Sequence, residues 1–449
     1  MTKTACIVLA AGKGTRMKSD LPKVMHKVAG RSLLAHVLTA ANETGALQHC
    51  VVSGPDMPEM EREVDLFSKN ARIVLQTERL GTGHAVSMAK DALAGFSGTI
   101  LILYGDVPLI QAQTLQKLIS MVSDEMPLAV LGFTAANPKG YGRLLCDDKG
   151  YLMAIREELD ASQEERKVDL CNSGIMAVAA DDLWPLLDSI GNDNANGEFY
   201  LTDIVGLTVA GGKNVGVAVC SESEVAGIND RQQLAAMEQV FQNKLRQQAM
   251  ENGATLIAPE TVFLSADTKI GRDVVIEPNV FMAPGVEIAD SVVVHGFCHL
   301  ADTRIGKGAV IGPFARLRPG TDLQANSKVG NFVEIKNATI HEGAKVNHLS
   351  YVGDATVGKS ANIGAGTITC NYDGFGKSHT SIGAGAFIGS NSSLIAPVKI
   401  GAGAYVGSAS VVTKDVPENA LALARAIQEN KPGWAERFRA AKTRKSKRT

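Results

Sequence analysis

Residues 305–340 read IGKGAV-IGPFAR-LRPGTD-LQANSK-VGNFVE-IKNATI, and every sixth position in this stretch holds an aliphatic residue. The same period begins earlier, at Leu264, Ile270, Ile276, Met282, Ile288, Val294 and Leu300, and returns at Ile382, Ile388, Leu394, Ile400, Val406 and Val412. A hexapeptide period is typical of a parallel β-solenoid with one short strand per repeat. We therefore predict that three repeats close one triangular coil over about residues 262–415, with the aliphatic side chain pointing inward.

The period fails between Ile363 and Ile382, where residues 370–379 read CNYDGFGKSH. This stretch does not fit a coil, so we predict that it forms a loop pushed out of the solenoid wall. Loops that leave a repeat array usually lie on its functional face. A neutral insertion is the alternative interpretation.

Residues 1 to about 228 alternate apolar runs with amphipathic stretches, which predicts a mostly parallel α/β sheet. The expected strands are Thr4–Leu9, His49–Ser53, Ile73–Gln76, Thr99–Tyr104 and Leu128–Phe133, and the expected helix is Leu33–Asn42. Ligands of such sheets bind beyond the carboxyl ends of the strands. A binding site is therefore expected in the loops that follow Leu9, Gln76 and Tyr104.

A single long helix is predicted over residues 230–251, because apolar residues recur there at helical spacing among polar ones. Asn229 or Asp230 can cap its start, and Gly253 can end it. We interpret this helix as a connector. The predicted organisation is a domain over residues 1–228, a linker helix over 229–251 and a solenoid domain over 252–449.

The charge and cysteine content exclude several classes of protein. The 449 residues carry 45 Lys and Arg against 47 Asp and Glu, which gives a net charge of −2 and no support for nucleic-acid or membrane partners. The 7 cysteines lie far apart without a Cys-x-x-Cys pair, so neither disulfides nor a zinc site is indicated. No apolar run is long enough to span a membrane. These features predict a cytoplasmic protein.

The first candidate site is the glycine turn after the first predicted strand. Residues 9–17 read LAAGKGTRM, and Pro22-Lys23 follow shortly afterwards. Small residues let backbone N–H groups approach a phosphate chain, while Lys13, Arg16 and Lys23 supply positive charge. The turn is neither a P-loop nor the dinucleotide fingerprint, because Gly-Lys-Ser/Thr and the third glycine are missing. Taken alone, it could be an ordinary tight turn.

Further polar and glycine residues follow other predicted strands. They are Gln76, Gly81-Thr82-Gly83, Tyr104-Gly105-Asp106, Gly140-Tyr141-Gly142, Glu157, Asn172-Ser173-Gly174 and Gly227-Ile228-Asn229. A carboxylate such as Asp106 at the end of a central strand is well placed to hold Mg²⁺ against phosphates. Singly, each residue could instead have a structural role, such as capping a turn.

The second candidate site lies in the solenoid. His348 belongs to the stretch Asn347–Tyr351, close before the predicted loop, and a histidine there could serve as a general base near neutral pH. Arg318 and Lys336 are separated by 18 residues, which is one full coil, so they are expected to stack into a cationic strip suited to a sugar phosphate. Two solvated surface cations are the alternative.

Residues 9–17 with Pro22-Lys23 resemble the sugar-1-phosphate nucleotidyltransferases. The whole order, with the hexapeptide region, resembles the bacterial bifunctional enzymes that join UDP-N-acetylglucosamine pyrophosphorylase to glucosamine-1-phosphate N-acetyltransferase. The resemblance implies a Rossmann-like domain, a linker helix and a left-handed parallel β-helix. It implies UTP and acetyl-coenzyme A as substrates, Mg²⁺ as cofactor, a homotrimer, and a product that supplies precursors of peptidoglycan and lipopolysaccharide.

The same resemblance implies roles for individual residues of the first domain. Arg16 and Lys23 would act in catalysis, Lys13 and Arg16 would face the triphosphate, and Asp106 and Asn229 would ligate Mg²⁺. The nucleotide or nucleotide-sugar would be held by Leu9, Ala10, Ala11, Gly12, Lys23, Gln76, Gly81, Thr82, Tyr104, Gly105, Asp106, Gly142, Glu157, Asn172 and Asn229. We choose Glu157 over its neighbour Glu158 for this role.

In the β-helix, the resemblance makes His348 the general base. Arg318, Lys336, Tyr351 and Asn362 would hold the amino-sugar phosphate, and acetyl-coenzyme A would contact Asn371, Tyr372, Ser390, Ser408 and Arg425. Asn371 and Tyr372 would also border the amino sugar. Arg425 is expected to reach the site of a neighbouring chain in the trimer.

Two other functions remain possible at this point. One is a nucleotidyltransferase whose solenoid is only a trimerising or regulatory scaffold, and the other is an assembly protein that senses sugar nucleotides. A scaffold has no need of His348 or of the loop at 370–379, and a sensor has no need of a catalytic Mg²⁺.

Overall fold

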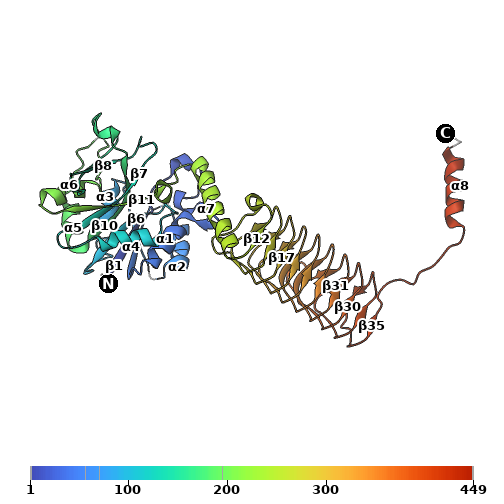
Figure 1. Cartoon of the computed structure of the whole chain (residues 1–449). Helices are drawn as coiled ribbons and strands as arrows, with labels where there is room; N and C mark the ends of the chain where they lie inside the picture. Colours follow the sequence, from blue (N-terminus) through green and yellow to red (C-terminus); the bar gives the residue numbers. More distant parts are fainter. Residues whose placement is uncertain (1–2, 56, 70, 195, 447–449) are drawn as a thin grey trace. The chain divides into compact units, whose positions relative to one another are not determined.

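The structure is a computed structural model that describes residues 3–55, 57–69, 71–194 and 196–446 (Figure 1). The chain divides into two compact units, Met1–Leu245 and Arg246–Thr449. The division falls inside a long helix, α7 (Arg231–Glu251).

The N-terminal unit is built on one sheet with the strand order β11-β7-β10-β6-β1-β4-β5. These strands are β1 (Thr4–Leu9), β4 (Gln48–Ser53), β5 (Arg72–Leu75), β6 (Thr99–Tyr104), β7 (Leu128–Thr134), β10 (Leu170–Ala179) and β11 (Val215–Cys220). The pairs β1–β4, β1–β6, β4–β5 and β7–β11 are parallel, as predicted. One long strand, β10, is antiparallel to both of its neighbours, β6 and β7.

Two apolar cores lie on opposite faces of this sheet, because alternate residues of each strand point to opposite sides. On one face, Val8 and Leu103 pack with α1 (Leu33–Glu43), α2 (Glu59–Phe67) and α4 (Ala112–Ser120). On the other face, Ile7 and Ile102 pack with α3 (Thr82–Ser87), α5 (Ala180–Asp188) and α6 (Asp203–Ala210). The carboxyl ends of β1, β5 and β6 border a cleft.

Two short hairpins complete this unit. The strands β8 (Arg143–Cys146) and β9 (Leu152–Arg156) pair with each other, and β8 extends the sheet beside β10. The strands β2 (Lys27–Val28) and β3 (Arg31–Ser32) form a small separate ribbon.

Helix α7 has the boundaries that the sequence predicts. The Asp230 carboxylate accepts a hydrogen bond from the backbone N–H of Gln233 (2.8 Å) and caps the start, and Gly253 follows the end with a φ of 98°. Met237 and Phe241 are buried, so the first half of the helix packs against the N-terminal unit.

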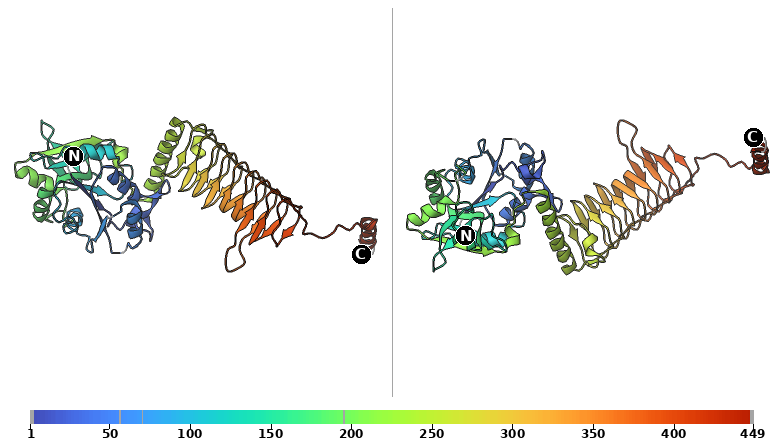
Figure 2. Two further views of the ribbon diagram at one scale, coloured as in Figure 1. Left: turned by 90° about the horizontal axis from the view of Figure 1, so that it is seen from below. Right: turned by 90° about the horizontal axis from the view of Figure 1, so that it is seen from above.

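The C-terminal unit is a parallel β-helix with three faces (Figure 2). The first face stacks β12 (Thr255–Leu256), β14 (Val275–Ile276), β17 (Val293–Val294), β20 (Val310–Ile311), β23 (Lys328–Val329), β25 (Lys345–Val346), β27 (Asn362–Ile363), β30 (Phe387–Ile388), β33 (Tyr405–Val406) and β35 (Leu421–Ala422). The second stacks β13 (Lys269–Ile270), β16 (Val286–Ile288), β19 (Thr303–Ile305), β22 (Thr321–Leu323), β29 (Thr380–Ile382) and β32 (Val398–Ile400). The third stacks β15 (Phe281–Met282), β18 (His299–Leu300), β21 (Arg316–Leu317), β28 (Ile368–Cys370), β31 (Ser393–Ile395) and β34 (Val411–Val412).

Two longer strands run round the corner between the second and third faces. They are β24 (Glu334–Ile340) and β26 (Tyr351–Val357), and each belongs to both faces. The structure ends its described part in a further helix, α8 (Trp434–Ser446).

The aliphatic residues of the six-residue period are buried inside the coil, as predicted; Ile311, Leu317 and Val329 have no exposed surface. The β-helix extends beyond the predicted limits of 262 and 415, from β12 to β35. The six-residue period did not predict the terminal coils, because the residues that pair there are not 18 apart in the sequence: Leu256 pairs with Ile276, and Val406 pairs with Ala422.

The predicted extruded loop is confirmed. In β26, Tyr351 pairs with Ile368, but Ala355, four residues later, pairs with Thr380, so the chain between β28 and β29 must leave the wall. A bridge between Tyr372 and Lys377 closes this loop into a small hairpin. The loop stands away from the coils in Figure 2.

Within the described ranges, no helix is both long enough and apolar enough to cross a membrane. All of the cysteines of the chain are free.

Candidate functional site

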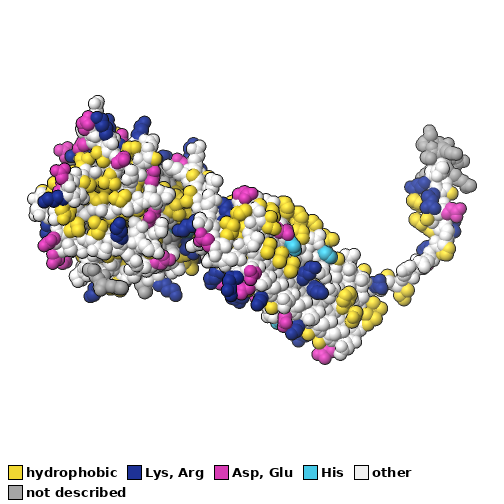
Figure 3. All heavy atoms as spheres, viewed as in Figure 1, with side chains coloured by type: hydrophobic (Ala, Val, Ile, Leu, Met, Phe, Trp, Pro, Cys, Tyr) yellow, Lys and Arg dark blue, Asp and Glu magenta, His cyan; other side chains and the backbone are white. Residues whose placement is uncertain are grey.

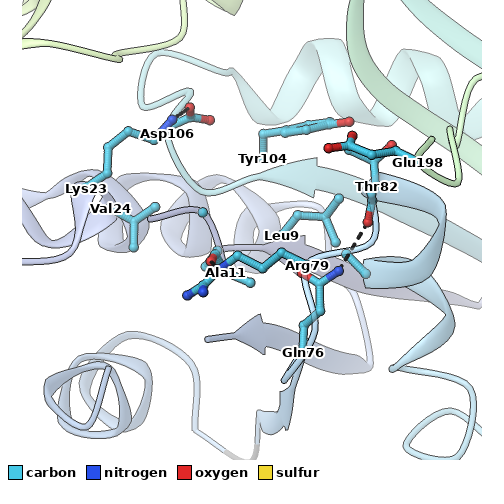
Figure 4. Close-up of a pocket in the computed structure, with 14 residues that line it drawn as sticks. Leu9, Ala11, Lys23, Val24, Gln76, Arg79, Thr82, Tyr104, Asp106 and Glu198 are labelled. Atoms are coloured by element: carbon cyan, nitrogen blue, oxygen red, sulfur yellow. Dashed lines mark hydrogen bonds and ion pairs between the residues drawn. The ribbon is translucent and has the colours of Figure 1, made fainter. Parts of the chain in front are cut away.

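A cavity of about 230 Å³ opens at the carboxyl ends of β1, β5 and β6 (Figure 4). It is lined by Leu9, Ala10, Ala11, Gly12, Lys23, Val24, Gln76, Arg79, Gly81, Thr82, Ala85, Tyr104, Asp106 and Glu198. Ten of these residues are among those predicted for the nucleotide. The strand order brings them together, since the loops after β1, β5 and β6 meet at one edge of the sheet.

A second cavity of about 320 Å³ adjoins the first and shares Thr82, Tyr104 and Glu198 with it. Its other lining residues are Gly140, Glu157, Glu158, Leu159, Asp160, Asn172, Asn196, Tyr200 and Thr202. The two cavities therefore form one cleft, with residues of the glycine turn in its first part and the predicted Glu157 and Asn172 in its second part.

Gln76 and Gly81 are fixed against each other at one end of the cleft. The buried Gln76 side chain donates a hydrogen bond from Nε2 to the Gly81 carbonyl (3.1 Å), which orients its amide. Gly81 has a φ of 113°, and a Cβ there would lie 2.6 Å from the Phe199 carbonyl oxygen, so only glycine fits.

Arg79 was missed by the sequence analysis, although it stands between Gln76 and Gly81. Its Nε donates a hydrogen bond to the Ala11 carbonyl (2.7 Å), and its guanidinium lines the cavity beside the glycine turn. Figure 4 draws it reaching across from the strand of Gln76 towards Ala11.

Lys23, Asp106 and Asn229 meet at the mouth of the cleft. The Lys23 ammonium forms a close ion pair with the Asp106 carboxylate and lies 3.2 Å from the Asn229 amide oxygen. Both lysine and aspartate side chains are largely buried. Oxygen atoms from Asp106 and Asn229 thus already converge on one cation, and this carboxylate and amide donor set suits Mg²⁺.

Lys13 and Arg16 are exposed and do not line either cavity. They lie on the glycine turn itself, where Gly14 has a φ of 60°. Gly105 is placed as predicted beside this turn, because its N–H donates to the Leu9 carbonyl (2.9 Å).

Gly142, Glu157 and Asn172 lie together at the other end of the cleft. The Asn172 N–H donates to the Gly142 carbonyl (2.8 Å), and a Cβ on Gly142 would lie 3.3 Å from both Glu157 carboxylate oxygens. Burial raises the pKa of Glu157, and the neighbouring Asp160 and Asp203 add to the shift. Burial, with Asp106 and Glu157 nearby, also raises the pKa of Tyr104.

Glu158 has a different partner from Glu157. It forms an ion pair with the buried Arg143 (2.8 Å) and accepts a hydrogen bond from the Gly140 N–H (3.2 Å). Glu158 therefore shapes the turn at residues 140–142, while Glu157 faces Gly142 and Tyr104. This arrangement is consistent with the choice of Glu157.

On the β-helix, His348 lies in the turn between β25 and β26, and its Nδ1 forms a short hydrogen bond with the Asn331 side-chain oxygen. An amide oxygen can only accept, so Nδ1 carries the proton and Nε2 keeps a free lone pair. Asn331 occupies the corresponding turn one coil earlier, and the Leu349 N–H donates to its carbonyl (3.1 Å). Sequence analysis missed Asn331; stepping one coil back from His348 could have found it.

Ser390 and Ser408 follow His348 along the same edge of the β-helix. Backbone hydrogen bonds run along this edge from Gly366 to His348 (3.0 Å), from Asn391 to Ala365 (2.7 Å) and from Ala409 to Ser390 (2.8 Å). Both serines are exposed. Two of the predicted acetyl-coenzyme A residues, Ser390 and Ser408, therefore lie along one edge that begins at His348.

A cluster of three cations lies at the far side of the same face. Arg318 and Lys336 are in register on adjacent strands, as predicted from their spacing. Lys377, from the extruded loop, lies against Lys336, and this contact with Lys377, together with Arg318, lowers the pKa of Lys336. Glu334 pairs with Arg318 at 2.7 Å. Lys377 is a further residue that sequence analysis missed, because only the fold brings the loop back to Lys336.

The loop is attached to the wall through Asp354. The Asp354 carboxylate accepts hydrogen bonds from the side chains of Asn337 (2.6 Å) and Asn371, and it faces Lys336 and Lys377. Burial alone would raise its pKa, but these amides and cations together hold the pKa below its usual value. The Asn371 amide also lies 3.5 Å from the Tyr351 hydroxyl, so both predicted residues are close to the cations.

The other predicted residues are more dispersed. The Asn362 side-chain oxygen accepts from Asn347 (3.2 Å), beside His348, while the Tyr372 hydroxyl donates to Gly374 within the loop (2.7 Å). Ala424 still bonds to the wall, through Val411 and Ser410, but Arg425 is exposed just beyond it. The structure of one chain does not bring Arg425 to His348.

Groups of three or more His, Cys, Asp or Glu side chains able to hold a metal are absent from the described residues.

Comparison with known proteins gives matches for both units. Residues 6–171 match the MobA-like NTP transferase domain family, and residues 379–414 match the bacterial transferase hexapeptide repeats. The chain is 60% identical over 441 residues to a protein of Rhodopseudomonas palustris named bifunctional protein GlmU, covering 98% of this chain and 97% of that protein. Proteins of the same name from Azorhizobium caulinodans and Nitrobacter hamburgensis are each 55% identical, over 436 and 444 residues, with 97% or more of each chain covered.

Proposed function

The chain belongs to the family of bifunctional GlmU proteins, and from that premise we propose how its residues divide two reactions between its two units. The enzyme transfers an acetyl group from acetyl-coenzyme A to glucosamine-1-phosphate, and a uridylyl group from UTP to N-acetylglucosamine-1-phosphate. The observation that carries the proposal is that each unit holds its own polar site: the cleft around Lys23 and Asp106, and the face between His348 and Lys336.

In uridylyl transfer, the sugar phosphate attacks the α-phosphorus of UTP, the bond to the β-phosphate oxygen breaks, and pyrophosphate leaves. No protein nucleophile is needed, so positioning and charge neutralisation carry the catalysis. Lys23, and Arg16 on the exposed turn, would neutralise the phosphates. Gln76 and Gly81 would hold the nucleotide, while Glu157 and Asn172 would hold the sugar.

Mg²⁺ fits the place where Asp106 and Asn229 converge on the Lys23 ammonium. These two oxygen ligands would hold the ion, and bound Mg²⁺ would neutralise charge on the triphosphate. Lys23 would then be free to turn from Asp106 towards the phosphates.

In acetyl transfer, the amine nitrogen of glucosamine-1-phosphate attacks the thioester carbonyl, a C–N bond forms, and the C–S bond breaks. His348 Nε2 would take the proton from the amine, because Asn331 holds the opposite nitrogen in its protonated form. The departing thiolate is then protonated to the free thiol. Ser390 and Ser408 would line the coenzyme along the edge beyond His348.

The cluster of Arg318, Lys336 and Lys377 would hold the phosphate of the amino sugar. Crowded like charges repel, and a bound phosphate dianion relieves that repulsion. Tyr351, Asn362, Asn371 and Tyr372 would contact the amino sugar between the cluster and His348. We add Lys377 and Asn331 to the residues that sequence alone suggests.

A homotrimer would complete the acetyl-transfer site. Next to His348, the exposed side chains of Phe297, Phe314, Phe332 and Leu349 occupy one corner of successive coils, and the rings stack at 4.8 and 5.1 Å. A second copy of the chain could cover this apolar edge and enclose a long ligand that a single flat wall cannot. Arg425, which is exposed in its own chain, would reach acetyl-coenzyme A bound to a neighbouring chain of the trimer.

The two alternatives explain less of the structure. A purely structural hexapeptide domain gives no reason for the Asn331–His348 pair, or for the crowding of Arg318 and Lys336 with Lys377 of the extruded loop. A sugar-nucleotide sensor gives no reason for the convergence of Asp106 and Asn229 on a cation.

We also propose the domain limits 1–228, 229–251 and 252–449, a cytoplasmic location in keeping with the free cysteines, and a role in making cell-wall precursors.

The test uses the whole chain with glucosamine-1-phosphate, acetyl-coenzyme A, UTP and Mg²⁺, and it follows release of free thiol and pyrophosphate separately. We expect Asp106→Ala to abolish pyrophosphate release from UTP and N-acetylglucosamine-1-phosphate while thiol release continues. His348→Ala should have the opposite effect. Loss of both activities in either folded variant would contradict the assignment of two separate sites.

A further inference from the structure

The first half of α7 is part of the N-terminal unit and does more than connect the domains. Met237 and Phe241 are buried on it, and the Phe241 ring packs against His36 of α1 with 4.4 Å between centroids. The first half of α7 is therefore packed against α1.

Arg231, at the start of α7, contacts two residues of the segment that precedes α1. Its Nε donates a hydrogen bond to the Met17 carbonyl (3.1 Å), and its Nη1 lies 3.4 Å from His26 Nδ1. Met17 is buried and ends the turn that carries Arg16. The two contacts bracket Lys23, which lies between Met17 and His26 in the chain.

Glu238, two turns further along α7, holds a third point. Its carboxylate accepts a hydrogen bond from the Ala29 N–H (2.7 Å), at the turn of the β2–β3 ribbon where Ala29 has a φ of 48°. Gln242 donates to the other carboxylate oxygen (2.8 Å) and orients the group. A backbone in this strained region needs an anchor, and Glu238 supplies it.

The same end of α7 also positions Asn229. The Asn229 N–H donates to the Gln233 side chain (2.7 Å), which fixes the residue whose amide oxygen approaches Lys23. Residues 229–238 thus contact the catalytic segment 16–29 at several points, although the two stretches are far apart in sequence.

We infer that the first two turns of α7 form part of the uridylyl-transfer site, with Arg231 and Glu238 acting as positioning residues for Arg16 and Lys23. This inference rests on the proposed function of the cleft. Neither residue lines the cavities, so both act through the segment that they hold. Misplacement of a charge by about 1 Å at a phosphate can cost about 100-fold in rate.

The experiment compares Arg231→Met, Glu238→Ala and Glu238→Gln in the full chain with Mg²⁺. We expect Arg231→Met to lower kcat for uridylyl transfer by about 10- to 100-fold with a smaller change in the KM for UTP, because Arg16 and Lys23 act on charge that develops during the reaction. Glu238→Ala should lower kcat in the same way. Glu238→Gln should stay near wild type, since its amide oxygen can still accept from Ala29.

Lys244→Met is the matched control, because it removes an exposed cation from the same helix. Acetyl transfer in each preparation is the internal control and should be unchanged. Wild-type kcat in both Arg231→Met and Glu238→Ala, or equal loss of both activities in each, would overturn the inference. If Arg231→Met fails to fold, the contrast between Glu238→Ala and Glu238→Gln decides. A wild-type chain without uridylyl transfer would instead refute the proposed function.

Discussion

The hydrogen bond between Asn331 and His348 gives the sharpest prediction for acetyl transfer. Replacing Asn331 by Ala removes the acceptor that keeps the proton on Nδ1 and the lone pair on Nε2. A hydrogen bond of this kind contributes about 1 to 1.5 kcal/mol, which corresponds to about 5- to 12-fold in rate. We expect kcat for acetyl transfer to fall by that factor, with little change in either KM. His348→Ala, which removes the base itself, should cost about 100- to 10,000-fold.

The assay follows free thiol release from acetyl-coenzyme A by the full chain, and uridylyl transfer by the same preparation reports on its folding. Gln324→Ala is a matched control, because Gln324 makes the same kind of amide contact with His341 across one coil (3.0 Å), among residues with no predicted role in the reaction. In a His348→Ala background, Asn331→Ala should have no further effect. An Asn331→Ala enzyme within twofold of wild type, or an equal loss in Gln324→Ala, would refute the reasoning.

Two further predictions concern ligand binding and assembly. Lys377→Ala should raise the KM for glucosamine-1-phosphate about tenfold with little change in kcat, as expected for a charge-assisted phosphate contact on a partly exposed surface. Lys377→Arg should restore the KM, and an unchanged KM in Lys377→Ala would mean that Lys377 does not bind the phosphate. Chains carrying His348→Ala and chains carrying Arg425→Ala, unfolded together and reassembled, should recover acetyl transfer in mixed trimers, whereas trimers of confirmed mass without recovery would mean that both residues act within one chain.

The sequence predicts those parts of the fold that depend on a local pattern of burial. The β-helix repeats one aliphatic position every six residues, because each coil must bury the same side chain. The strands β1 and β6 were predicted at their observed limits, since each is a mostly apolar run that begins with a threonine and is followed by a small residue, Ala10 or Gly105. Strand β10 was not predicted, because Asn172-Ser173-Gly174 interrupts its apolar pattern and is typical of a turn, so its antiparallel placement was not foreseen either.

The limits of prediction are similar at the two sites. Residues in the loops after β1, β5 and β6 could be found, since the ends of parallel strands always meet at one edge. Lys377 could not be found from a motif, because only the fold brings its loop back to Lys336, whereas Asn331 could have been found by stepping one coil back from His348. Arg231 and Glu238 carry no motif at all. Only the packing of α7 shows that they hold a segment some 200 residues away in the chain.

The two proposed phosphate sites differ in how their positive charge is balanced, and this difference fits the reactions that we propose for them. In the N-terminal cleft, Lys23 is neutralised by Asp106, and both are largely buried, so the site tolerates its cation before any phosphate arrives. On the β-helix, Lys336 and Lys377 lie together against a single carboxylate, Asp354, while Glu334 pairs with Arg318, so two lysines share one negative charge. The second site therefore gains from a phosphate directly. The first must exchange one partner of Lys23 for another, and bound Mg²⁺ at Asp106 and Asn229 would make that exchange favourable by taking over the two oxygens that now hold the ammonium.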